Sequence, residues 1–127
     1  MHLEKVVVGT STYDRVREDN SAAMRLLGQA LTLSNDVQSE IDGKLVGDPT
    51  EVAMYRAAMA AGLVKAELEK QFPRIAELAF DSGRKRMSTL HRTGSRVLLF
   101  CKGAPEYILP HCRDSVDVET LNPDDVL

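Results

Sequence analysis

Aromatic side chains are scarce in this chain, which has no tryptophan and only three residues each of tyrosine and phenylalanine. Proteins that hold nucleic acid strands commonly line a basic groove with several aromatic rings. This chain has no interleaved rings of that kind, and its net charge is −3. Both features argue against a nucleic-acid binder. The scarcity also makes a single ring beside a cationic cluster informative.

Cysteine is rarer still, with two residues, Cys101 and Cys112, and no CxxC pair. We expect reduced thiols of a cytosolic compartment, with a disulfide between the two cysteines as the alternative. His111 precedes Cys112, but adjacent ligands without a second pair fit no zinc spacing. We therefore expect no metal site.

Long apolar runs are missing. No stretch approaches the roughly 20 residues of a membrane-spanning helix, and no charged-then-apolar leader opens the chain. We therefore expect a soluble chain without a signal peptide. The phosphate-binding loop GxxxxGK does not occur in the sequence either, so any nucleotide would have to be held in another way.

Hydrophobic periodicity and turn signals predict a strand, three helices, three strands and a final helix, in that order. The predicted ranges are 3–8, 21–33, 49–61, 64–72, 75–80, 86–92, 96–102 and 104–112. Asn20 and Asp48 are the expected N-caps, and Glu51 has the spacing of a capping box with Asp48. The order of elements indicates an α+β fold, with a mainly antiparallel sheet flanked by helices.

The length favours a single domain over residues 1–127, with a main body over 1–112 and an acidic tail over 113–127. The last predicted strand, 96–102, is followed only by a helix and this tail. That arrangement is compatible with a sheet that lacks its natural last strand.

The stretch FDSGRKRMS, residues 80–88, places one aromatic ring beside three cations. Phe80 ends a predicted strand, where one face of its ring can stay free to stack on a base. Lys85, at the predicted start of the next strand, would lie within reach of a stacked nucleotide. The alternative is a core position for Phe80 and a solvated turn at Arg84–Arg86.

The stretch KGAPE, residues 102–106, follows the last predicted strand directly. Gly103 carries no side chain, so a ligand can approach the backbone closely. The next residues open a helix, whose first N–H groups favour phosphate. The alternative is an ordinary strand-to-helix turn with a surface lysine at position 102.

The stretch GDPTE, residues 47–51, opens a predicted helix. The Glu51 carboxylate could accept a hydrogen bond from the exocyclic amine of adenine. Taken alone, the stretch favours a capping role, in which Glu51 completes the cap begun by Asp48, and one carboxylate oxygen cannot serve both purposes.

In this order and spacing, the three stretches resemble the nucleotide-binding domain of a P-type ATPase. The resemblance covers almost the whole chain, and it is strongest for the cation pumps of the calcium-pump and sodium-pump branch. It implies an ATP-binding module that takes MgATP and delivers the terminal phosphate to an aspartate in a separate phosphorylation domain. It also implies the phosphorylation and actuator domains as partners, in a membrane-embedded parent of which this chain is a cytoplasmic domain.

The resemblance implies a role for each motif residue on the adenine side of the site. Phe80 would stack on the base, and Met87 would pack beside it. Glu51 would meet the adenine amino group, with Thr50 next to it.

The remaining motif residues are implied to line the rest of the pocket. Lys85 would contact the nucleotide near its phosphates, with Ser82 in the same segment. Lys102 and Gly103 would line the deep side.

Two features depart from the family pattern. The DKTGT motif that carries the phosphorylated aspartate does not occur in the sequence, so this chain alone should bind ATP without hydrolysing it. The arginine that the family supplies on a strand beyond KGAPE has no counterpart either. The alternative function is a protein-interaction domain that docks an acidic partner through Arg84–Arg86.

Overall fold

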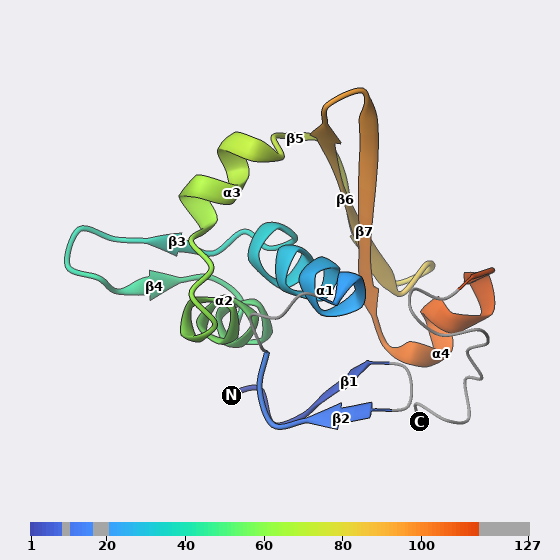
Figure 1. The fold of residues 1–127 in the computed structure, drawn as a ribbon, viewed down its shortest axis with the longest axis horizontal. Helices are drawn as coiled ribbons and strands as arrows, with labels where there is room; N and C mark the ends of the chain where they lie inside the picture. Colours follow the sequence, from blue (N-terminus) through green and yellow to red (C-terminus); the bar gives the residue numbers. More distant parts are fainter. Residues whose placement is uncertain (9–10, 17–20, 115–127) are drawn as a thin grey trace.

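The computed structural model describes residues 1–8, 11–16 and 21–114, so most of the expected acidic tail at 113–127 lies outside the described residues. Figure 1 shows helices α1 and α2 side by side, with a long antiparallel sheet next to α1. The elements are β1 (Val6–Val8), β2 (Ser11–Tyr13), α1 (Ala22–Leu33), β3 (Gln38–Ser39), β4 (Leu45–Val46), α2 (Pro49–Ala60), α3 (Lys65–Gln71), β5 (Arg74–Asp81), β6 (Arg86–Thr93), β7 (Arg96–Gly103), α4 (Pro105–Ile108) and a 3₁₀ turn at Leu109–His111.

The main sheet contains β5, β6 and β7 in that order, and every pairing is antiparallel. It confirms the expected α+β class and the three predicted strands. Thr93 pairs with Arg96 across a two-residue turn, in which Gly94 has a φ of 60°. Glycine adopts this left-handed conformation without the steric penalty that a Cβ would bring.

A β-bulge interrupts β5 near its end. Leu78 pairs with Ser88 and Asp81 pairs with Arg86, so two residues of β5 stand opposite the single residue Met87. Phe80 is one of those two. The bulge therefore places the Phe80 backbone directly across from Met87.

The helix starts follow from local capping. In α2 the Asp48 carboxylate accepts from the backbone N–H of Thr50 (2.9 Å) and of Glu51 (3.3 Å), as predicted. The cap of α1 is Ser21, whose Oγ accepts from the Met24 N–H at 3.1 Å. This cap lies one residue later than predicted, and Asn20 itself is outside the described residues.

Three local predictions were wrong. Residues 11–13, expected in a loop, pair with β1, and the predicted loop after α1 contains the small β3–β4 hairpin. The final helix is shorter than predicted, because α4 gives way to a 3₁₀ turn at Leu109. The three missed strands, β2, β3 and β4, have only two or three residues each, which is too short to show an alternation of apolar and polar residues.

The core has two parts along α1. Near its start, Met24 packs with Val6 and Val16 from the amino-terminal segment. At its end Leu33 is buried, and Ser34 lies against Met87 of β6, with its hydroxyl 3.5 Å from the Met87 sulfur. The carboxyl end of α1 is thereby fixed against the sheet.

The two faces of the main sheet differ in burial. Met87, Thr89 and His91 of β6 are buried and share their face with Lys102 and Phe100 of β7. On the opposite face Leu78, Val97 and Leu99 are each about half exposed. Two residues of the predicted site, Met87 and Lys102, thus lie on the face that meets the carboxyl end of α1.

No helix in the described part of the chain combines the length and apolar character needed to cross a membrane.

Candidate functional site

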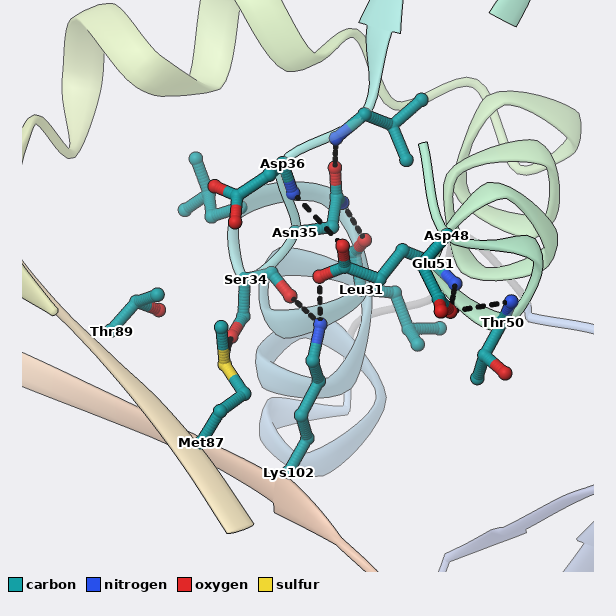
Figure 2. Close-up of polar contacts among 12 residues, drawn as sticks. Leu31, Ser34, Asn35, Asp36, Asp48, Thr50, Glu51, Met87, Thr89 and Lys102 are labelled. Carbon is teal, nitrogen blue, oxygen red and sulfur yellow. Dashed lines mark hydrogen bonds and ion pairs between the residues drawn. The ribbon is translucent and has the colours of Figure 1, made fainter. Parts of the chain in front are cut away.

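Two of the predicted motifs are joined by an ion pair. The Lys102 ammonium, from KGAPE at the end of β7, lies 2.5 Å from Oε2 of Glu51, which belongs to GDPTE in the first turn of α2 (Figure 2). The side chains are 23% and 16% exposed, so the pair is partly withdrawn from solvent. Segments far apart in the sequence therefore meet at one point.

Lys102 has a second partner at the end of α1. Its ammonium donates to the Ser34 carbonyl at 2.5 Å. The carboxyl end of a helix carries partial negative charge, so a cation is favoured there. Two of the three N–H groups of Lys102 are used in these contacts, and one remains for another acceptor.

The Glu51 carboxylate contacts residues outside α2. One oxygen accepts from Lys102, and the other accepts from the Asp36 N–H at 3.5 Å. Asp48 supplies the cap through its own side chain. The competition between the capping role and the tertiary role is therefore resolved in favour of the tertiary contacts of Glu51.

The third motif reaches the same face through the sheet. Met87 is buried and pairs with Lys102 in the β6–β7 register. Phe80 stands across from Met87 on β5, and its side chain is 65% exposed. The ring is therefore exposed to solvent and does not belong to the core. One of its faces is available for stacking.

Lys85 lies in the turn between β5 and β6, directly before the start of β6 at Arg86, as predicted. Its φ of 57° is the only positive value among the described non-glycine residues. Its exposed ammonium sits 5.6 Å from the centre of the Tyr107 ring, a cation–π contact. Ser82 is exposed in the same turn.

The other two cations of this stretch point to the main chain. Arg84 donates to the carbonyl of Arg86 at 3.1 Å, and Arg86 lies 3.5 Å from the carbonyls of Arg84 and Tyr107. These contacts occupy part of their donor capacity, so Lys85 is the most accessible positive charge of the three.

Gly103 and Thr50 are held for local structural reasons as well. A Cβ on Gly103 would come within 2.8 Å of the Lys85 carbonyl oxygen, so only glycine fits where β7 passes this turn. The exposed Thr50 places its hydroxyl 3.3 Å from the Met1 sulfur.

Residues that the motifs did not include surround the end of α1. Asn35 is fully buried, and Lys65 and Arg74 donate to carbonyls around it. The sequence carries one weak signal, because asparagine sometimes follows a helix end, although Asn35 does not adopt the left-handed conformation of that motif. The long-range donors Lys65 and Arg74 have no comparable local signature.

Burial shifts two titrating groups near this region. Desolvation lowers the pKa of Lys65 below its ordinary 10.5, although nearby Glu69 acts in the opposite sense. Desolvation also lowers the pKa of His91, whose Nδ1–H donates to the Phe72 carbonyl while Nε2 accepts from Thr89.

A cavity of about 410 Å³ opens beside Lys65, Arg74 and Tyr55. It does not offer free cations, because the Lys65 ammonium already donates to Asn35 O, Asn35 Oδ1 and Val37 O at 2.8–3.0 Å. Its polar lining is therefore part of the support around the end of α1.

Comparison with known proteins shows the class to which this domain belongs, a cytoplasmic domain of P-type ATPases. Residues 22–123 match the family described as P-type ATPase, cytoplasmic domain N. The chain belongs to this family, which uses ATP and places the domain on the cytoplasmic side of the membrane.

Similar curated proteins are cation pumps. The chain is 38% identical over 91 residues to calcium-transporting ATPase 1 of Lactococcus lactis, covering 72% of this chain and 10% of that protein. It is 38% identical over 104 residues to calcium-transporting ATPase 1 of Bacillus cereus, covering 80% and 12%. It is 40% identical over 95 residues to the probable cation-transporting ATPase F of Mycobacterium tuberculosis, covering 72% and 10%. The chain thus spans about a tenth of the length of these relatives.

Proposed function

We propose that residues 1–127 form the ATP-binding module of a cation-transporting P-type ATPase of the calcium-pump and sodium-pump branch. Phe80 stacks on the adenine, Glu51 accepts from the adenine amino group, and Lys85 contacts the phosphate end. The observation that carries this proposal is the meeting of the three motifs, through the Glu51–Lys102 pair and the pairing of Met87 with Lys102.

Several side chains at this site have exposed surfaces or hydrogen-bonding groups that a nucleotide could use. Phe80 offers an exposed ring, and one N–H of Lys102 is uncommitted. The Glu51 oxygen that accepts from Asp36 does so at 3.5 Å, which is a long contact and leaves room for a stronger donor. Lys85 is exposed and can leave Tyr107 for a phosphate.

The role in the parent pump would be positioning. ATP supplies the transferable phosphoryl group, and this module holds it for an aspartate of the phosphorylation domain. Without the DKTGT motif, these 127 residues should bind MgATP and leave it intact. One stacked ring and a few exposed cations support a Kd of roughly 1 mM or somewhat tighter, about −4 kcal/mol.

An ATP titration followed by amide NMR tests the proposal. The backbone signals of Phe80, Lys85 and Lys102 should move together. The Phe80→Ala change should weaken binding by roughly 1–3 kcal/mol, by analogy with other base–aromatic stacks. Leu78→Ala is the matched control, because Leu78 is a comparably exposed apolar residue of β5 on the opposite sheet face.

The outcome that rejects the proposal is equally clear. If the three signals stay still at several millimolar ATP, no nucleotide site exists at this face. The rival function, docking of an acidic partner through Arg84–Arg86, predicts binding that weakens steeply with salt and does not depend on adenine.

A further inference from the structure

Three cations from different elements converge on the carboxyl end of α1. Lys65 comes from α3, Arg74 from the start of β5 and Lys102 from β7. Arg74 donates to the carbonyls of Leu33 (3.0 Å) and Asn35 (2.9 Å), and Lys102 donates to that of Ser34. Unpaired carbonyls and the negative end of the helix dipole attract such donors.

Asn35 organises the same turn from within. Its side-chain amide donates to the carbonyls of Leu31 (2.8 Å) and Thr32 (3.0 Å), and its Oδ1 accepts from the Val37 N–H. Lys65 then donates to Asn35 and to the Val37 carbonyl. The turn 34–37 is therefore fixed by the Asn35 side chain and by cations from three distant elements, α3, β5 and β7.

Lys65 and Arg74 direct most of their donors to protein partners. Lys65 uses its three N–H groups within the turn, and Arg74 also pairs with Asp36 (2.8 Å) and Glu77 (3.0 Å). The partial burial of the Lys65 ammonium carries a desolvation cost, which is consistent with the lowered pKa of this group. These contacts use all three N–H groups of Lys65 and four of the five N–H groups of Arg74.

The other contacts of this turn hold two residues of the proposed ATP site, Lys102 and Glu51. Ser34 supplies the carbonyl that holds Lys102, and Asp36 supplies the N–H that holds Glu51 (Figure 2). Any displacement of the turn would move both groups. The turn is thus a common base for a pair whose partners come from β7 and α2.

We propose that Lys65 and Arg74 are positioning residues of the ATP site, which set the placement of Lys102 and Glu51 through the turn 34–37. This inference rests on the function proposed above. Lys65 and Arg74 act on ATP affinity without touching the nucleotide.

The test compares Lys65→Met with Lys70→Met, a change at an exposed lysine of the same helix. Side-chain NMR signals of Lys102 Cε and Glu51 Cδ are recorded without ATP, and ATP affinity is then titrated. We expect both signals to shift in Lys65→Met and the Kd to rise about threefold to tenfold, the range of moderate coupling through a packed network. Lys65→Arg, which restores the charge and donors, should recover part of both effects, and Lys70→Met should match the wild type.

The two readouts separate this inference from the proposed function. Absence of ATP binding in the wild type rejects the function, while the ATP-free signals still test the positioning. Unchanged Lys102 and Glu51 signals in folded Lys65→Met overturn the inference, as does an unchanged Kd.

Arg74→Lys provides a second variant, because it keeps the charge but cannot bridge two carbonyls and two carboxylates. It should change the same signals to a smaller extent. If both variants fail to fold, the two residues serve stability alone and the inference is also overturned.

Discussion

Gly103 lies against the carbonyl of Lys85, so closely that a Cβ at position 103 would stand 2.8 Å from that oxygen. The glycine of KGAPE and the lysine of FDSGRKRMS are therefore packed together at one end of the β6–β7 pair. Arg86, which pairs with Gly103, would also come within 3.3 Å of the added carbon.

This contact predicts a marked effect of Gly103→Ala. Backbone atoms on both strands would have to separate, and overpacking of this kind costs about 1–3 kcal/mol in the free energy of unfolding. Urea unfolding measures the change, with Ser95→Ala at an exposed position of the β6–β7 turn as the control. Equal stability of Gly103→Ala and the wild type would show that the strands do not approach as closely as described.

Lys85 combines a strained backbone with a proposed functional side chain. A left-handed φ of 57° is unfavourable for lysine and easy for glycine. Lys85→Gly should therefore raise stability by about 0.5–1 kcal/mol while it weakens ATP binding, because the phosphate contact is lost. Thermal melts and ATP titration measure the two effects.

The control for this prediction is Lys85→Arg, which keeps both the charge and the strain. It should retain most of the ATP affinity and show no gain in stability. ATP binding by Lys85→Gly at the wild-type affinity would remove Lys85 from the site.

The Glu51–Lys102 pair should show strong coupling in a double-mutant cycle. Glu51→Gln or Lys102→Met alone leaves a partly buried charge without its partner, whereas the double change removes both charges. We expect the effects on unfolding to be non-additive by about 1–2 kcal/mol. Additive effects in urea unfolding would mean that the pair is not formed in solution.

His91 predicts a specific dependence of stability on pH. Burial lowers its pKa in the fold from the ordinary 6.5, and nearby Arg74 acts in the same direction while the hydrogen bond to Phe72 and the charge of Glu69 oppose it. The unfolded chain then binds the proton more readily, so the free energy of unfolding falls as the pH drops below about 6.5.

Replacing the imidazole tests this dependence. His91→Gln should reduce the loss of stability between pH 7.5 and 5.5, measured by urea unfolding at each pH. His111→Gln is the control, because His111 is exposed. An unchanged pH dependence in His91→Gln would show that His91 does not cause the loss of stability at low pH.

The parts of the fold that could be predicted from sequence are those with local chemical signals. Asp48 and Pro49 define the start of α2, and the alternation of β6 and β7 around Gly94 defines the hairpin. The β3–β4 hairpin escaped prediction, since each strand has two residues and shows no periodicity.

The candidate site divides in the same way. The sequence predicts its motif residues from the three stretches that contain them, and the structure shows Phe80 exposed. The support from Lys65 and Arg74 could not be predicted, because each acts on carbonyls at least 28 residues away in the chain. Every residue carries a backbone carbonyl, so the sequence does not indicate which carbonyl a distant lysine or arginine will contact.

The central claim is that adenine stacks on Phe80, and the nuclear Overhauser effect between ATP and the protein tests it most directly. With three phenylalanines in the chain, the Phe80 ring signals can be assigned by substitution. The account predicts cross-peaks from the adenine H2 and H8 protons to the Phe80 ring, lost in Phe80→Ala and kept in Leu78→Ala. Adenine cross-peaks to other residues, with the Phe80 ring unaffected by saturating ATP, would contradict it.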